Sequence, residues 1–445
     1  MVKKLLAFTA TVLAVVLLFS SCESMRIVNT VDSLLTPPLY YTEYEGLVDA
    51  FNHITGGKPV LITPSDGDFL SAITVDDFDG DGTEEAVVLY RGAQNQAENF
   101  ASVCFLKNSD DGWNKIENFQ GYGNEVNSLS IADLDDDGSS EIMIIWSYSG
   151  ISGGYVLSVY GGFSADKCRE LTNQPCDLAD MIDIDSDGLK EIFLISSVTD
   201  EGVVSRSAKA LKFVDGKIKA KGSTPVDSGV VAYGSIKAES ISGKAPRLFI
   251  DAVKTDKQMI TEIIEWNSEK GELTAPLYDE TTGTNSLSLR YEQIPCGDVD
   301  NDGKIEIPIQ SPYGEKSEED SDGLYLTKWM SFEGAKPHCK KKTIVNVQDG
   351  YMISPDKTGV SKIGITRYPS RSCWIVYKDD GKSKIGNELF TILKVSNKRW
   401  NTEDMSGYIP VIQNSEGVVC VYLTEKGRKM GYNENKLSRM IEETV

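Results

Sequence analysis

A nine-residue acidic motif occurs four times and constrains the fold more than any other feature of the chain. Its copies begin at Asp77, Asp133, Asp183 and Asp298. Each copy has carboxylates at positions 1, 3, 5 and 9 and a glycine at position 6. Carboxylates crowded into one loop repel each other, and Ca²⁺ takes several carboxylate and carbonyl oxygens at once. We therefore predict calcium as the cofactor, with up to four ions, one per loop.

EF-hand loops begin in the same way, but they need a glutamate at position 12 and a helix after it. In this chain position 12 is apolar in every copy: Val88, Ile144, Leu194 and Ile309. A strand-like apolar run follows each loop, for example residues 86–90 and 142–146, and a shorter one precedes it. The repeating unit is therefore strand, acidic loop, strand, and the EF-hand interpretation fails.

The copies recur with a period of about 50–60 residues, which is typical of repeat architectures. The longer interval between the third and fourth copies contains a degenerate copy at 239–247, and another lies at 354–362. Arg247 and Lys362 replace the final glutamate in these two, which argues against metal there. One more period reaches the apolar runs at 409–412 and 418–423, so seven units fit the chain.

A repeat of this length with about four short strands is typical of a propeller blade. We predict an all-β fold, a seven-bladed β-propeller of four-stranded antiparallel blades spanning residues 58–430. Hairpins are expected over 100–119 and over 207–221, the second with a tight turn at Asp215-Gly216. A strand at 59–62 is predicted to complete the last blade and close the ring.

The loops resemble those of the FG-GAP/VCBS-like family, the calcium-loop propeller blades also found in integrin α-subunit heads. In that family the carboxylates at positions 1, 3, 5 and 9 and the carbonyl at position 7 bind calcium. The resemblance implies these ligands here: Asp77, Asp79, Asp81, Thr83 and Glu85; Asp133, Asp135, Asp137, Ser139 and Glu141; Asp183, Asp185, Asp187, Leu189 and Glu191; Asp298, Asp300, Asp302, Lys304 and Glu306. Position 9 is Glu here where the family more often has Asp. Family members mostly bind partners or act as scaffolds.

The N-terminus has the pattern of a leader. Lys3 and Lys4 precede an apolar stretch over 5–19, and Cys22 follows two serines. This resembles a bacterial lipoprotein signal, so residues 1–21 are predicted to be a signal peptide and Cys22 the lipid attachment site. Ordinary secretion with a chance cysteine is the alternative. The expected location is the outer face of the cytoplasmic membrane of a bacterium, with a Gram-positive one favoured.

Residues 22–57 are expected to form a tether followed by a short helix over 43–54, which Gly56 and Gly57 end. For the tail, 431–445, a capping helix and a final strand are both open. Seven cysteines remain besides Cys22. Cys168 and Cys176 are close enough in sequence to bridge, but most cysteines lie in strand-like runs, which favours buried free thiols.

The net charge of −22 opposes binding to nucleic acid and to anionic membranes. With only two histidines, His53 and His338, a Ser/His/Asp triad is hard to build. We therefore expect a monomeric, membrane-anchored, calcium-stabilised propeller that binds a protein or glycan partner or acts as a scaffold. The Cys22 lipid would be its only membrane contact. A calcium-dependent, phytase-like hydrolase and a purely structural envelope component remain alternatives.

Overall fold

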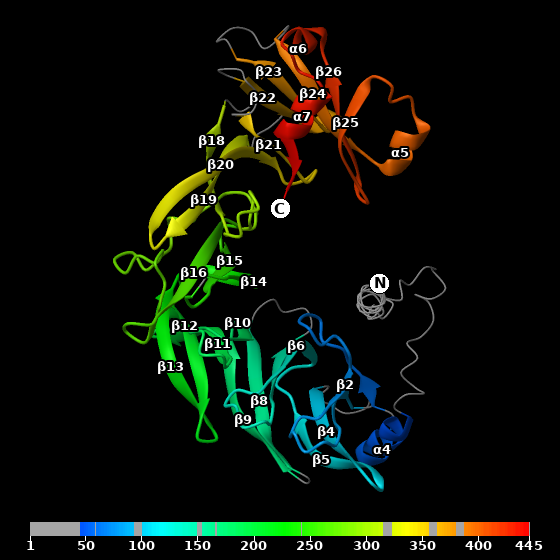
Figure 1. Ribbon diagram of the computed structural model, residues 1–445, viewed down its shortest axis with the longest axis vertical. Coiled ribbons are helices and arrows are strands. Elements are labelled where there is room, and N and C mark those ends of the chain that lie inside the picture. Colours follow the sequence, from blue (N-terminus) through cyan, green and yellow to red (C-terminus); the bar gives the residue numbers. More distant parts are fainter. Residues whose placement is uncertain are drawn as a thin grey trace, which may run out of the picture.

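The computed structural model describes residues 45–57, 59–92, 100–148, 154–164, 167–241, 243–314, 323–355, 363–379 and 387–444. These residues form six antiparallel sheets that follow one another in chain order along an arc (Figure 1). The predicted signal peptide, Cys22 and the tether up to residue 44 lie outside the described residues. Within the described ranges, no helix has both the length and the apolar character needed to cross a bilayer.

Three of the six sheets have four strands and the other three have five. The first contains β1 (Val60–Leu61), β2 (Ile73–Asp76), β3 (Glu85–Arg91), β4 (Ala101–Ser109) and β5 (Gly112–Gln120). The second contains β6 (Glu125–Ala132), β7 (Glu141–Ser147), β8 (Tyr155–Ser164) and β9 (Lys167–Cys176). The third contains β10 (Leu178–Ile182), β11 (Glu191–Asp200), β12 (Val203–Val214) and β13 (Lys217–Val226).

The later sheets repeat this order with additions. The fourth contains β14 (Val230–Glu239), β15 (Arg247–Lys254), β16 (Met259–Asn267) and β17 (Glu272–Thr274). The fifth contains β18 (Ile307–Tyr313), β19 (Leu324–Glu333), β20 (Lys336–Asn346), β21 (Tyr351–Ile353) and β27 (Ile441–Glu443). The sixth contains β22 (Ile363–Tyr368), β23 (Cys373–Lys378), β24 (Glu388–Val395), β25 (Tyr408–Asn414) and β26 (Gly417–Leu423).

The predicted blade unit is therefore present as antiparallel sheets, and both predicted hairpins are confirmed. The first of them is β4–β5 and the second is β12–β13. Asp215 and Gly216 connect the second hairpin with φ angles of 54° and 72°. Two consecutive positive φ angles match the twist of antiparallel strands, which is why the Asp-Gly pair signals a hairpin.

Two details of the predicted ring are corrected by the strand pairing. The runs expected to form a seventh unit are β25 and β26, which pair within the sixth sheet because β26 bonds to β24. The strand expected to close the ring is β1, and it pairs with β3 of the first sheet, Val60 opposite Arg91. The pairing therefore gives six sheets in the described residues.

The hydrophobic core is divided into clusters that lie between successive sheets. Phe105 of the first sheet packs on Tyr160 of the second, with 5.4 Å between ring centroids. Similar clusters join the second sheet to the third, the third to the fourth, the fourth to the fifth and the fifth to the sixth. Each sheet thus buries its two faces against its neighbours in the chain, as stacked repeats do.

Helices cover the faces that have no neighbouring sheet. Helix α4 (Glu45–Thr55), which confirms the predicted short helix, packs Leu47 and Phe51 on the first sheet. The ring of Phe51 meets that of Tyr90 edge-on at a centroid distance of 5.0 Å. On the sixth sheet, α5 (Asn397–Thr402) places Trp400 against Val395 and its neighbours. In Figure 1 the first and last sheets lie at opposite ends of the arc.

The tail contains both of the elements that the sequence left open. After α6 (Glu425–Lys429), helix α7 (Glu434–Met440) buries Leu437 and Met440 in the cluster between the fifth and sixth sheets. Strand β27 then pairs with β21, so the chain returns to the fifth sheet. A short 3₁₀ turn, η2 (Pro369–Arg371), connects β22 and β23.

The seven described cysteines are free thiols, as predicted, but only five of them are buried, because Cys339 is exposed and Cys373 is half-buried. Cys168 and Cys176 form no bridge, and both are buried on the second sheet. Burial raises the pKa of each of these thiols to about 12. They therefore remain protonated and act as small apolar side chains.

A buried polar network holds the long segment that connects β17 to β18. Arg290 is fully buried, and its guanidinium donates to Asp251 at 2.6 Å and to Thr261 at 3.0 Å. Nearby, Glu262 accepts hydrogen bonds from the backbone N–H of Asp227 at 2.9 Å and from the Asn285 amide at 3.1 Å. The segment has few strands of its own, so these bonds replace the ladder that a sheet would supply.

The network predicts a pH-dependent stability. Burial raises the pKa of Glu262 from 4.5 to about 7, because the hydrogen bonds to its carboxylate only partly offset the loss of hydration. The folded protein then holds this proton more tightly than the unfolded chain, so stability falls as pH rises from about 4.5 to about 7. Glu262→Gln, neutral at every pH, should gain roughly 1–3 kcal/mol relative to the unmodified protein between pH 5 and pH 8.

Urea unfolding at both pH values measures this difference. Glu272→Gln is the matched control, because this glutamate is exposed on β17 of the same sheet. Its difference from the unmodified protein should not change with pH. Parallel pH curves for Glu262→Gln and the unmodified protein would contradict the raised pKa.

Candidate metal-binding loops

The four acidic loops occupy the same place in their sheets. In the first three sheets the loop connects β2 to β3, β6 to β7 or β10 to β11, and its final glutamate is the first residue of β3, β7 or β11. In the fifth sheet Glu306 directly precedes β18. Position 2 is a buried apolar residue in each loop: Phe78, Leu134, Ile184 and Val299. This residue anchors one side of the loop in the core, and the glutamate anchors the other.

Backbone hydrogen bonds repeat from loop to loop. The glutamate at position 9 accepts the N–H of position 2, at 2.8 Å from Phe78 to Glu85 and 3.0 Å from Leu134 to Glu141. The aspartate at position 1 accepts the N–H of the position-6 glycine, at 2.9 Å in the loop that begins at Asp77. The same two bonds recur in the third and fourth loops. In all four loops the same backbone hydrogen bonds therefore hold the carboxylates of positions 1 and 9, although the residues between them differ.

The glycines are required by the backbone. Position 6 has φ between 81° and 95° in the four loops, a left-handed conformation in which a Cβ is unfavourable. Position 4 is also left-handed, with φ of 70° at Gly80 and 61° at Asp136. A Cβ on Gly80 would lie 2.6 Å from the carbonyl oxygen of Gly138, so the first and second loops are in contact. The glycines therefore allow both the turn and the side-by-side packing of the loops.

Carboxylate oxygens converge in each loop. In the first three, oxygens from positions 1, 3 and 9 lie within 4.8 Å of one another, and in the fourth those from positions 1, 3 and 5 do. These sets are Asp77, Asp79 and Glu85; Asp133, Asp135 and Glu141; Asp183, Asp185 and Glu191; Asp298, Asp300 and Asp302. The position-7 residues, Thr83, Ser139, Leu189 and Lys304, donate their backbone N–H to the position-5 carboxylate. Clusters of this kind suit a hard divalent cation.

In the first loop a lysine lies among the carboxylates. The ammonium group of Lys107, on β4, is 2.7 Å from an oxygen of Asp79, of Asp81 and of Glu85. Burial alone would lower the pKa of Lys107, but the three carboxylates outweigh it and raise that pKa. The side chain is therefore a fixed positive charge at the centre of the predicted ligand set.

In the third loop a lysine also bonds to the carboxylates, but it comes from the strand after the one that is equivalent to β4. Lys221 of β13 donates to Asp185 and, at 2.6 Å, to Glu191. Lys212 of β12 binds the outer aspartate, Asp187, at 2.6 Å, and this hydrogen bond lowers the pKa of Asp187. As in the first loop, lysines supply the positive charge.

The second loop has no such partner among the described residues. Asp135 keeps a buried oxygen, Oδ1, that has no hydrogen-bond partner. Burial raises the pKa of Glu141 to about 7, and the neighbouring aspartates at 133, 135 and 137 add to this rise. Unlike in the first and third loops, repulsion between the carboxylates is not relieved by a lysine, so these residues fit a bound cation.

The fourth loop is intermediate. Lys340 of β20 binds the outer oxygen of Asp302 at 2.5 Å and does not bond to Glu306. Glu306 is fully buried, and its Oε1 has no partner. Burial, with the charges of Asp298, Asp300 and Asp302, raises the pKa of Glu306 to about 7. The inner part of this loop therefore also fits a cation.

In the first degenerate copy an arginine stands where the acidic loops have their final glutamate. Arg247, at position 9, pairs with Glu239 at 2.7 Å and donates to the carbonyl oxygen of Phe332. Glu239 also accepts the N–H of Ile305, which links this loop to the fourth acidic loop. The second degenerate copy, 354–362, lies largely outside the described residues.

A polar groove lies beside the fourth acidic loop. Its volume is about 1070 Å³. The groove is lined by the degenerate loop, by Trp266 and Asn267 at the end of β16, and by Asp302 and Lys304 of the fourth acidic loop. Lys221 stacks its ammonium group over the Trp266 ring at 5.1 Å. The groove therefore has an aromatic side chain, both signs of charge and hydrogen-bonding groups along one surface. The sequence prediction missed it, because its walls come from two different sheets.

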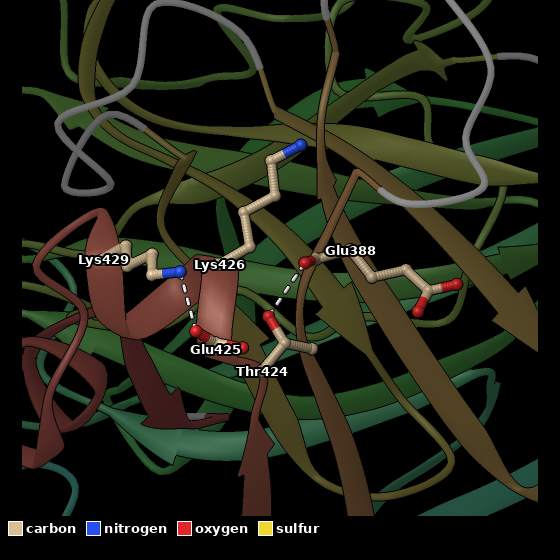
Figure 2. Close-up of a pocket in the computed structure, with 5 residues that line it drawn as sticks. All are labelled: Glu388, Thr424, Glu425, Lys426 and Lys429. Atoms are coloured by element: carbon tan, nitrogen blue, oxygen red, sulfur yellow. Dashed lines mark hydrogen bonds and ion pairs between the residues drawn. The ribbon is translucent and has the colours of Figure 1, made fainter.

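A smaller hollow of about 440 Å³ lies on the sixth sheet, at the start of α6 (Figure 2). The Thr424 hydroxyl donates to the carbonyl oxygen of Glu388 at 2.9 Å, and Glu425 pairs with Lys429 at 2.6 Å. The two histidines lie elsewhere: His53 is exposed on α4, and His338 lies on β20, 3.7 Å from Glu333.

No family model and no curated protein matches the chain. Among solved structures, a rhamnogalacturonan lyase of Bacillus licheniformis is 12% identical with a TM-score of 0.30, and the alignment covers 82% of this chain and 90% of the lyase. A hypothetical protein from Leishmania major is 15% identical with a TM-score of 0.23, covering 67% and 98% of the two chains. At these TM-scores the likeness carries no argument about fold or function.

The second loop predicts opposite effects of one substitution with and without calcium. In EDTA at pH 8, Glu141→Gln should raise the melting temperature by a few degrees, because a neutral amide relieves the buried repulsion. In millimolar calcium the order should reverse, since the variant lacks a ligand charge. Thermal unfolding followed by circular dichroism measures both conditions.

Glu84→Gln is the matched control, because Glu84 is an exposed carboxylate in the first loop that belongs to none of the clusters. It should leave the melting temperature nearly unchanged in either condition. If Glu141→Gln behaves like Glu84→Gln, the second loop does not bind calcium.

Proposed function

We propose that this protein is an extracytoplasmic, lipid-anchored binding module whose sheets are propeller-type blades and whose ligand lies in the groove beside the fourth acidic loop. Calcium stabilises the blades. The resemblance of the four loops to FG-GAP/VCBS-like repeats and the lipoprotein-like leader ending at Cys22 support this proposal. The groove, which combines Trp266 with hydrogen-bonding and charged side chains, is the observation that carries it.

The composition of the groove favours a neutral glycan as the ligand. Binding sites for polar molecules combine an apolar surface with a few placed polar groups that fix orientation. Here the indole of Trp266 supplies the first, and Asn267, Glu265 and Lys304 supply the second. The net charge of −22 repels polyanions, so an uncharged chain of sugars is favoured over an acidic one.

The hydrolase alternative receives less support from the same geometry. The described glutamates with raised pKa are Glu85, Glu141, Glu191, Glu262 and Glu306. They belong to five different places, each with its own structural hydrogen bonds. A catalytic acid and base would have to meet at one substrate.

Groove variants test the binding proposal. The purified protein should bind members of a panel of neutral oligosaccharides in isothermal titration calorimetry. The double variant Lys304→Ala with Glu269→Ala should weaken that binding about tenfold or more, because it removes two exposed polar groups at the groove's edge. Both side chains are exposed, so the double variant should still fold.

Lys398→Ala on α5 is the control, an exposed lysine on a different sheet. It should bind as tightly as the unmodified protein. If no neutral glycan binds, or if the groove and control variants bind equally, a glycan in this groove is excluded. A protein partner would then become the better interpretation.

A further inference from the structure

We infer that lysine side chains determine which acidic loops bind calcium. In the loops at 77–85 and 183–191 a lysine ammonium group occupies the place of the ion, whereas the loops at 133–141 and 298–306 are the calcium sites. The inference rests on the proposed calcium role and deepens it. It predicts two ions where the sequence motif alone predicts four. Its basis is a pair of equivalent positions in each of the four sheets that carry an acidic loop. We call them the third-strand position, on β4, β8, β12 or β19, and the fourth-strand position, on β5, β9, β13 or β20.

The third-strand position lies beside the glutamate of the loop. Glu85 is directly opposite Lys107 in the pairing of β3 with β4. In the second sheet Ile142 lies opposite Tyr160, so the following residue, Gly161, flanks Glu141. A Cβ on Gly161 would meet Glu141 Oε1 at 2.9 Å, so the glycine leaves open the space that a side chain would take. Lys107 and Gly161 therefore occupy equivalent positions in two sheets. Lys107 places an ammonium group in its loop, whereas Gly161 leaves that space open.

In the other two sheets the register places a lysine beside one glutamate and a small residue beside the other. Ile192 lies opposite Leu211, so Lys212 flanks Glu191 in the third sheet. Ile307 lies opposite Met330, so Ser331 flanks Glu306 in the fifth. The serine side chain is neutral, so it supplies no charge to the loop. The second and fifth sheets therefore lack the ammonium group at this position.

The fourth-strand position is a β-bulge that recurs in all four sheets. The extra residue of the bulge is Ile116 in the first sheet and Leu171 in the second. It is Lys221 in the third sheet and Lys340 in the fifth. Lys221 reaches Asp185 and Glu191, whereas Lys340 reaches only the outer oxygen of Asp302. The second sheet thus has no lysine at either position. The fifth sheet has Lys340, which pairs with Asp302 and not with Glu306.

An ammonium group and a calcium ion compete for the same oxygens. Lys107 takes one oxygen from each of three carboxylates, including two of the three that converge in its loop. A calcium ion at that point would be repelled by the positive charge of Lys107, and the lysine is buried, so its ammonium group cannot move out into solvent. Buried carboxylate oxygens without a hydrogen-bond partner occur in the third loop, at Asp183 and Asp185, as well as at Asp135 and Glu306. The second and fourth loops differ from the other two in that, among the described residues, no lysine bonds to their glutamate, whereas Lys107 bonds to Glu85 and Lys221 to Glu191. The arginine at position 247 is a further case of the same substitution.

Calcium counting on the purified protein tests this inference. Equilibrium dialysis against calcium, with bound metal measured by atomic emission, should give two ions per chain. Lys107→Met and Lys221→Met should each give three, and the double variant four. Leu171→Lys should place an ammonium group over the second loop, as Lys221 does over the third, and give one.

Lys115→Met is the matched control, an exposed lysine on β5 close to Lys107 in the chain but not bonded to the loop, and it should leave two ions. Four ions on the unmodified protein, or two on a folded double variant, would overturn the inference while leaving calcium stabilisation intact. No bound calcium on the unmodified protein would instead remove the proposed calcium role itself. If the lysine variants do not fold, two ions on the unmodified protein and one on Leu171→Lys would support the inference, and any other pair of counts would overturn it.

Discussion

Each acidic loop is tied to its sheet by a glutamate that accepts the N–H of the loop's second residue while its other oxygen faces the aspartates. These glutamates are at most 2% exposed, so their charge cannot be left to water. A cation has to be present, or the carboxyl has to hold a proton. The loops meet this need in different ways: Lys107 and Lys221 bond directly to Glu85 and Glu191, whereas Glu141 and Glu306 have no lysine bonded to them. The path of the chain between strands depends on how that charge is compensated.

The stacking of the sheets follows from the same repeat. A single four-stranded sheet exposes two apolar faces, so each one needs a neighbour, and the clusters between successive sheets provide it. At the two ends of the arc the need remains, and α4 and α5 meet it with Phe51 and Trp400. Terminal covers of this kind are what a stack of repeats requires when its ends do not meet. The tail has a related role, since α7 fills the space between the fifth and sixth sheets.

The groove occurs where the repeat is least regular. The fourth sheet has the degenerate loop, in which Arg247 replaces the final glutamate and pairs with Glu239. The segment after β17 forms isolated bridges and relies on the buried network around Arg290 and Glu262 for its hydrogen bonds. The first and second acidic loops touch at Gly80 and Gly138, whereas a space of about 1070 Å³ lies beside the fourth acidic loop. Binding surfaces on repeat proteins commonly arise where one repeat differs from the others.

The sequence by itself determined the local features. Alternating carboxylates with a glycine at position 6 specified the loops, since the left-handed backbone at Gly82 and Gly138 is a property of a few residues. Apolar runs with Asp-Gly turns specified the strands and hairpins, because turn chemistry and side-chain alternation are local. Tertiary structure decided the number of sheets, the partner of β1 and the place of β25 and β26, which depend on pairing between distant segments. It also decided which loops contain a lysine. Strand register places Lys107 opposite Glu85, and a β-bulge directs Lys221 toward the third loop. The motif within a loop contains no information about either, because both depend on neighbouring strands.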